Sequence, residues 1–282
     1  MMQDIAEAIS IGDLDVLRAR SMEVPALNVN QRLDKVRGDT LLTWACRHMQ
    51  LAVAQWLIER GAQMNATTAE GWTALMVASF KGHIACVRLL LDSGASVDHA
   101  MDDGTTALDL ACQEGDTDCA TLLLDAGAAV DHARDDGVTA LYMATQKGHP
   151  ECMQLLLDAG ATVDLCGDGG ATALFIAAQE GRPECVKLLL DAGATVDHIA
   201  DDGATALFLA TQEGRVECVR LLLGAGASVD LCGDDGVTPL IVASQNGHPE
   251  CLKLLLVAGA TVDHARDDGV MALFMASLNE HP

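Results

Sequence analysis

Basic residues are scarce in this chain. Of its 282 residues only 17 are lysine or arginine, whereas 41 are aspartate or glutamate, which gives a formal net charge of −24. A surface of this sign repels nucleic acid and anionic membranes, and it steers basic protein segments toward itself. The composition therefore argues against nucleic acid as a partner and favours a protein partner with a basic segment.

Long apolar runs and a secretory leader are also missing. Residues 1–10 have neither the basic start nor the apolar run of a secretory signal. No stretch approaches the roughly 18 apolar residues that a membrane span requires. We therefore expect no membrane insertion and a soluble, intracellular protein of the cytoplasm or nucleus.

Catalytic and metal-binding motifs are missing as well. No nucleophile, base and orienting acid recur together, and no phosphate-binding loop appears. His149 and Cys152 stand at helical i, i+3 spacing, but no Cys-x-x-Cys pair beside them completes a tetrahedral zinc site. Residues 98–109 resemble a calcium loop only faintly, because the twelfth position is aspartate. The sequence predicts no enzyme activity, no cofactor and no metal site.

What the sequence has instead is a repeat. A glycine recurs every 33 residues, within phrases such as Asp-Asp-Gly-Val-Thr-Ala-Leu, at Gly38, Gly71, Gly104, Gly137, Gly170, Gly203, Gly236 and Gly269. A fixed period of this length indicates a stacked array of small units in place of a closed globule with a central active site. We therefore expect function to lie along a surface.

Each unit carries signals for two helices and a projecting loop, called here the finger. In the unit that opens at Gly137, Thr139 is placed to cap a first helix that ends at Gly148. Pro150 stands where the first turn of a second helix tolerates proline. Residues 161–170 form a short extended piece that runs into a glycine turn. The predicted order is helix, turn, helix, finger.

At this point the chain resembles the ankyrin repeats. The family phrase G-x-T-P-L-x-x-A-A-x-x-G-H-x-E-x-V-x-x-L-L-x-x-G-A-x-V is matched by residues 71–97, and again by the units that open at Gly104, Gly137, Gly170, Gly203 and Gly236. The resemblance implies an all-α solenoid of helix-turn-helix units with β-hairpin fingers. It also implies that the chain binds another protein.

The chain departs from the family phrase at two positions. Alanine replaces the motif proline except at Pro239, and the usual first-helix histidine is replaced by Met76, Asp109, Tyr142, Phe175, Phe208, Ile241 and Phe274. Whatever bonding that histidine supports in the family must be dispensable here. We therefore expect some units to be less stable than consensus repeats.

Nearest-neighbour stacking makes the whole chain, residues 1–282, a single expected domain. Residues 1–34 look like a degenerate N-terminal capping repeat, 35–67 an atypical repeat, 68–265 six regular repeats and 266–282 a C-terminal half repeat. The last unit lacks its second helix. Three explanations stay open: the last unit is a half-repeat cap, the chain is truncated, or the chain belongs to a longer parent protein.

Most of the ten cysteines follow the repeat. Six occupy one position in the second helix, where we expect small core residues, namely Cys86, Cys119, Cys152, Cys185, Cys218 and Cys251. Packed helices lie about 8–10 Å apart, which exceeds the roughly 7 Å Cα separation that a disulfide tolerates. Cys166 and Cys232 stand in fingers and are expected to be exposed. Such thiols fit a reducing compartment.

Paired carboxylates mark the finger turns. They are Asp102 and Asp103, Asp135 and Asp136, Asp201 and Asp202, Asp234 and Asp235, and Asp267 and Asp268. One interpretation is an acidic row that attracts a basic partner segment. The other is that aspartate before glycine favours a turn and that surplus charge keeps the array soluble.

The family resemblance places partner binding at the fingers and at the exposed end of the first helix. Besides the finger aspartates, the candidate positions are Arg47, His48, Trp72, Phe80, Lys81, Gln113, Glu114, Gln146, Lys147, Gln179, Glu180, Gln212 and Glu213. Trp72 and Phe80 are predicted to be exposed, and large aromatic side chains there would carry much of the binding energy. Alternatively, both pack against the atypical Gly38 unit and its Trp44 and Trp56. The near-identity of the later repeats places specificity within residues 47–114.

The sequence therefore predicts a non-enzymatic, monomeric scaffold or adaptor that binds a partner protein with a basic segment. The alternative is an ankyrin-repeat targeting fragment of a larger multidomain enzyme or channel, and a third possibility is a structural array without a fixed partner.

Overall fold

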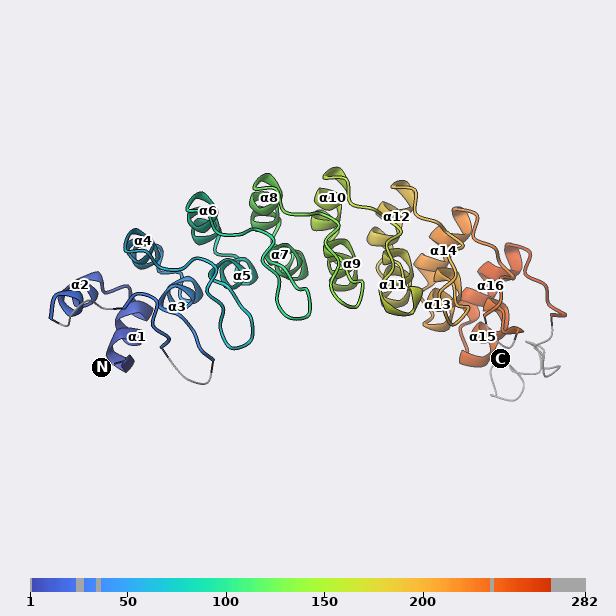
Figure 1. The fold of residues 1–282 in the computed structure, drawn as a ribbon. Helices are drawn as coiled ribbons and strands as arrows, with labels where there is room; N and C mark the ends of the chain where they lie inside the picture. The colour runs from blue at the N-terminus through green and yellow to red at the C-terminus, as the bar shows by residue number, and fades with distance from the viewer. Residues whose placement is uncertain (1, 24–27, 34–36, 234–235, 265–282) are drawn as a thin grey trace. The chain divides into compact units, whose positions relative to one another are not determined.

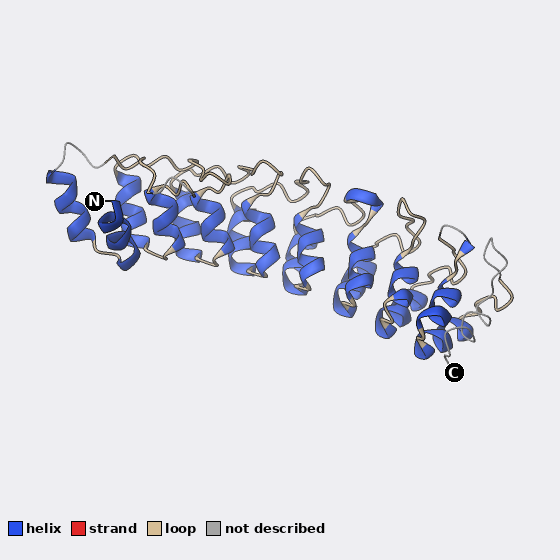
Figure 2. Cartoon of the chain, turned by 90° about the horizontal axis from the view of Figure 1, so that it is seen from below, coloured by secondary structure: helices blue, strands red, loops and turns tan. Residues whose placement is uncertain are grey.

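The computed structural model describes residues 2–23, 28–33, 37–233 and 236–264. In this part of the chain there are sixteen α-helices, one short 3₁₀ helix and no β-strand (Figures 1 and 2). None of the described helices is long and apolar enough to cross a membrane. The predicted C-terminal half repeat and the Asp234/Asp235 and Asp267/Asp268 pairs lie outside the described residues.

The structure divides into two compact units, Met1–Asp135 and Asp136–Pro282. The prediction of a single domain therefore stays a prediction. The helices of the first unit are α1 (Met2–Ile11), α2 (Leu14–Glu23), α3 (Leu41–Arg47), α4 (Leu51–Glu59), α5 (Ala74–Phe80), α6 (Ile84–Asp92), α7 (Ala107–Glu114) and α8 (Thr117–Asp125). Each odd-numbered helix packs against the even-numbered helix that follows it, and α1, α3 and α5 each pack against the next odd-numbered helix as well.

The second unit repeats this arrangement. Its helices are α9 (Ala140–Lys147), α10 (Pro150–Asp158), the 3₁₀ helix η1 (Asp168–Gly170), α11 (Ala173–Glu180), α12 (Pro183–Asp191), α13 (Ala206–Gln212), α14 (Val216–Gly224), α15 (Pro239–Asn246) and α16 (Pro249–Val257). Within the unit, first helices stack on first helices and second helices on second helices. The order helix, turn, helix, finger is confirmed.

In the described part of the chain, the first helix of each repeat from α3 onward begins at a buried threonine. In the α9 repeat, Thr139 Oγ1 accepts a 3.4 Å hydrogen bond from Tyr142 N–H, which satisfies a donor that the helix cannot pair internally. Gly148 ends α9 in the left-handed region with φ 76°, and Pro150 occupies the first turn of α10. These sequence predictions are confirmed. The same cap is formed by Thr40, Thr73, Thr106, Thr172, Thr205 and Thr238.

The fingers differ from the expected β-hairpins. In the finger before α7, Met101 N–H donates to Thr105 C=O at 2.9 Å and Gly104 N–H donates to Met101 C=O at 3.0 Å, which closes a tight turn. The arms are too short to extend this pairing into strands. Successive fingers are joined by a backbone bond, for example 3.1 Å from Asp135 N–H to Asp103 C=O.

A second set of bonds between neighbouring repeats was not anticipated from the sequence. The Asp164 carboxylate accepts hydrogen bonds from Thr195 N–H at 3.1 Å and from its hydroxyl at 2.6 Å. Asp197 binds Ser228 in the same way, at 2.9 Å and 2.6 Å. The sequence signal for these bonds is an aspartate that recurs every 33 residues, followed 31 residues later by serine or threonine except after Asp98, where Ala129 stands. A share of the acidic residues therefore couples repeats.

The predicted burial of the cysteines is confirmed. The six second-helix cysteines are buried, whereas Cys166 and Cys232 are exposed. Burial, reinforced by the Asp116 carboxylate, raises the pKa of Cys119 to about 12, and burial raises the pKa of Cys185 to about 11. These two thiols therefore stay protonated at neutral pH and serve as packing residues.

The residue that replaces the family histidine in α7 forms part of the helix cap. Asp109 is buried, and its Oδ2 accepts 2.8 Å hydrogen bonds from both the N–H and the hydroxyl of Thr106. Together with the Thr106 cap this makes a reciprocal capping box. In α5, Met76 Sδ takes the same place and accepts a 3.4 Å bond from Thr73 N–H.

Replacement of Asp109 by asparagine is expected to remove a pH dependence of stability. Burial raises the pKa of Asp109, although the Thr106 bonds and the charges of His132 and Arg134 oppose the rise. The raised pKa contributes stability that is fully present below the pKa of the unfolded chain, about 3.9. This stability is lost as pH rises through the higher pKa of the folded protein. Wild type should therefore gain stability relative to Asp109→Asn as pH falls from neutral toward the unfolded pKa of about 3.9, measured by urea unfolding. A pH-independent difference would contradict this.

Candidate partner-binding site

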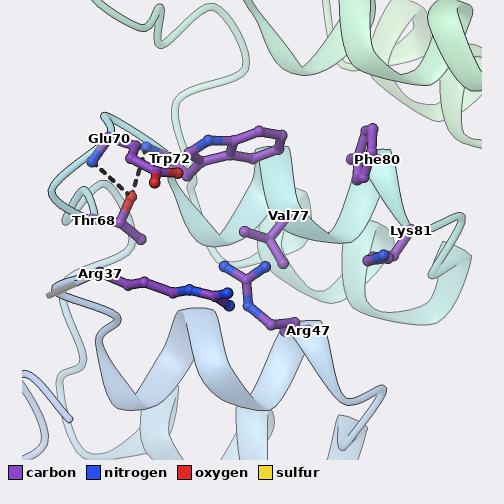
Figure 3. Close-up of a pocket in the computed structure, with 8 residues that line it drawn as sticks. All are labelled: Arg37, Arg47, Thr68, Glu70, Trp72, Val77, Phe80 and Lys81. Atoms are coloured by element: carbon purple, nitrogen blue, oxygen red, sulfur yellow. Dashed lines mark hydrogen bonds between the residues drawn. The ribbon is translucent and has the colours of Figure 1, made fainter. Parts of the chain in front are cut away.

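A pocket in the first unit collects several of the predicted binding residues. It has a volume of about 250 Å³ (Figure 3). The lining side chains come from two successive fingers and from the C-terminal ends of α3 and α5, and they are Arg37, Arg47, Thr68, Glu70, Trp72, Val77, Phe80 and Lys81. Of these, Arg37, Thr68, Glu70 and Val77 were not among the predicted site residues.

Trp72 and Phe80 form an aromatic pair at the pocket. Their ring centroids lie 5.5 Å apart with the planes at 75°, an edge-to-face contact. Both side chains are half-buried, because each ring covers part of the other. They are therefore less exposed than the sequence predicted. Trp44 and Trp56 have other contacts: Trp44 Nε1 donates to Ser10 at 2.8 Å, and Trp56 stacks with Arg60.

The finger holds Trp72 in place through its backbone. Thr68 Oγ1 accepts hydrogen bonds from Glu70 N–H at 3.3 Å and from Trp72 N–H at 3.2 Å. Thr68 N–H in turn donates to Trp72 C=O at 2.9 Å. Gly71 between them has φ +84°, a conformation that a side chain disfavours. The indole is therefore presented by a closed turn, which limits the entropy lost when a partner contacts it.

Arg47 reaches the pocket from the preceding repeat. Its Nη2 donates to Asp39 Oδ1 at 3.0 Å, and Asp39 is fully buried at the position that Trp72 occupies in the next repeat. The Arg47 Nε is buried and has no hydrogen-bond partner among the described residues. Lys81 Nζ lies 5.2 Å from the centre of the Phe80 ring. The cationic groups thus stand beside the aromatic pair.

His48, the last candidate near this pocket, is exposed at the C-terminal end of α3. Partial burial and the neighbouring Arg47 charge lower the pKa of His48, and Asp39 opposes the change only in part. At neutral pH His48 is therefore an uncharged group, one able both to donate and to accept hydrogen bonds.

The remaining candidates at the first-helix ends follow one pattern. The glutamines are half-buried and the residues after them are exposed. In the first unit these are Gln113 and Glu114, and in the second unit they are Gln146, Lys147, Gln179, Glu180, Gln212 and Glu213. They repeat once per unit of the array, and no aromatic pair like Trp72 and Phe80 stands beside them among the described ring contacts.

The paired finger aspartates have two different environments. The second member of each described pair stabilises the turn: Asp103 Oδ1 accepts from Thr105 N–H at 2.9 Å, and Asp136 and Asp202 accept in the same way at 3.2 Å and 3.0 Å. Burial raises the pKa of Asp103, but the Thr105 bonds and Arg134 outweigh it, so the pKa lies below its usual value. The first members, Asp102, Asp135 and Asp201, are exposed.

Stacked helix pairs connected by finger loops define a helical-repeat fold. A family model that describes three successive ankyrin repeats matches the chain at residues 6–101, 42–134, 96–166, 126–200, 159–232, 174–266 and 225–282. The chain therefore belongs to the ankyrin repeat family, whose repeats generally mediate protein–protein interaction.

Among solved structures, the chain is similar to the human ASB11 ankyrin repeat domain. The two share 30% sequence identity with a TM-score of 0.70, and the match covers 79% of this chain and 99% of that one. Comparison with the curated proteins gives no match.

Proposed function

We propose that this chain is a non-enzymatic scaffold or adaptor that binds a partner protein through its fingers and first-helix ends. The observation that carries the proposal is the pocket of the first unit, where a closed finger turn presents Trp72 beside Phe80. A rigid, half-buried aromatic pair is the type of group that dominates the energy of protein interfaces. The protein is proposed to act as a monomer inside the cell and to bind no nucleic acid.

The exposed finger aspartates are proposed to attract a basic segment of the partner. Asp102, Asp135 and Asp201 are exposed, whereas the aspartate after each of them is used in its own turn. An exposed ion pair contributes only about 0.2–1 kcal/mol, so no single aspartate decides binding. Their sum acts on the rate of association and on selectivity for a basic surface.

A matched pair of charge variants tests this proposal. The finger variant is Asp102→Asn/Asp135→Asn/Asp201→Asn, and the control changes the exposed aspartates Asp125, Asp158 and Asp191 at the ends of second helices. The finger variant should lower capture of basic partners from lysate about threefold or more at low salt, by the ion-pair energies above. The control should leave capture unchanged. Equal losses in both variants, or no loss in either, would contradict a basic segment bound at the fingers.

A further inference from the structure

The charge around the pocket is opposite to that of the chain. Three of its four charged lining residues are cations, Arg37, Arg47 and Lys81, and Glu70 is the only acid among them. In the whole chain acids outnumber bases by 41 to 17. The pocket therefore suits a ligand group of the opposite sign to the basic segment proposed for the fingers.

The arginine side chains are arranged to bind a planar anionic group. Arg37 and Arg47 extend toward one another below Val77 (Figure 3). Asp39 fixes Nη2 of the Arg47 guanidinium at 3.0 Å, while the Arg47 side chain remains 27% exposed. The terminal Nη donors of a guanidinium that is oriented in this way can bind the oxygens of a carboxylate.

The opposite wall of the pocket is apolar. The indole of Trp72 and the ring of Phe80 stand edge to face, with Val77 between them and the arginines (Figure 3). A volume of about 250 Å³ lies below the usual range of about 300–1,000 Å³ for small-molecule sites. The space therefore fits one or two amino-acid side chains better than a cofactor.

We propose that this pocket binds an aspartate or glutamate side chain of the partner that stands next to an apolar residue. The carboxylate lies between Arg47, Arg37 and Lys81, and the apolar side chain lies against Trp72 and Phe80. The inference rests on the proposed function, because it names the chemistry that one part of the same surface recognises. The partner segment thus carries an acidic anchor for the pocket besides any basic residues that face the fingers.

Blocked peptides test the inference directly. We would titrate the full chain by calorimetry with acetylated, amidated hexapeptides in which leucine or phenylalanine precedes glutamate, and with matched sets that carry glutamine or lysine instead. Because the peptides are amidated, the glutamate side chain supplies the carboxylate. The best glutamate peptide should bind about tenfold more tightly than its glutamine counterpart, and it should retain binding at near-physiological salt, since partly buried charge pairs are weakly screened.

Three variants locate the effect. The first variant is Lys81→Gln. The second is Asp39→Asn/Arg47→Gln, which removes both members of the ion pair so that no buried charge is left unpaired. Each should reduce the preference for glutamate severalfold, and circular dichroism verifies that both variants fold. Lys187→Gln, at an exposed lysine of the second helix α12 outside the candidate binding surface, should leave the preference unchanged. The inference is overturned if no glutamate peptide binds, if glutamine or lysine peptides bind equally well, or if Lys81→Gln keeps the full preference. The proposed function is tested separately: if the peptide experiment fails but the finger-aspartate variant loses basic partners as expected, the proposed function holds and only the role of this pocket is rejected.

Discussion

Truncation of both aromatic side chains, in the variant Trp72→Ala/Phe80→Ala, is expected to weaken binding of a captured partner by about 30-fold or more. Interface residues of this type lose about 2 kcal/mol or more on truncation, and every 1.4 kcal/mol is tenfold in affinity. The pair is held in place before binding, by the Thr68 bonds and by the 5.5 Å contact between the rings. Little of the contact energy is then spent on ordering the two side chains.

The matched control for this experiment is Gln113→Ala. Gln113 holds the position of Phe80 one repeat later and is also half-buried, but no aromatic partner is found beside it in the described ring contacts. Its truncation should change affinity by less than about threefold, in line with the small effects of peripheral contacts. Urea unfolding of each variant separates lost binding from lost structure, because the edge-to-face contact itself contributes about 0.5–1.5 kcal/mol. Equal effects of the double variant and the control would exclude the aromatic pair as the anchor.

Replacement of Gly104 by alanine is expected to destabilise the first unit by about 2–5 kcal/mol. Gly104 has φ +84°, where an L side chain costs about 1–2 kcal/mol. A Cβ there would also lie 2.8 Å from the Arg134 Cα and 3.1 Å from the Asp135 nitrogen. These are backbone atoms of the next finger, so they can give way only by shifting that finger, at a cost of about 1–3 kcal/mol more.

Gly127→Ala separates the two causes. Gly127 has nearly the same backbone angle, φ +87°, but a Cβ there would meet nothing within 4 Å. Its substitution should therefore cost only the conformational part, about 1–2 kcal/mol. The measurement is the urea-unfolding free energy of the two variants against wild type. If Gly104→Ala were no more destabilising than Gly127→Ala, that result would contradict the close packing of successive fingers at Gly104.

The sequence was sufficient to predict features that depend on short stretches of chain. The threonine cap at Thr139, the glycine stop at Gly148 and Pro150 in the first turn of α10 are each decided by neighbours within a few residues. The buried position of Cys152 followed from the period and the apolar face of its helix. Because the array repeats, one correctly interpreted unit predicted the others.

Features that depend on how side chains meet in space, within a repeat or between repeats, were not predictable in this way. The half-burial of Trp72 depends on the Phe80 ring, and the charge beside it depends on Arg47 from the preceding repeat. The buried Asp39 that orients Arg47 occupies a position where the other repeats carry no acid, so the period gave no guidance. The recurrence of Asp164 with the period marked its position, but its bond to Thr195 depends on how the next repeat packs against it.

A hydrogen-exchange footprint of the complex with a captured partner tests the central claim most directly. If the fingers and first-helix ends are the binding surface, amide protection should increase in residues 37–48 and 68–82 and in the fingers that carry Asp102 and Asp135. The second helices α4, α6 and α8 should exchange as they do in the free protein. New protection confined to those second helices would place the partner on another surface and contradict the proposed binding site.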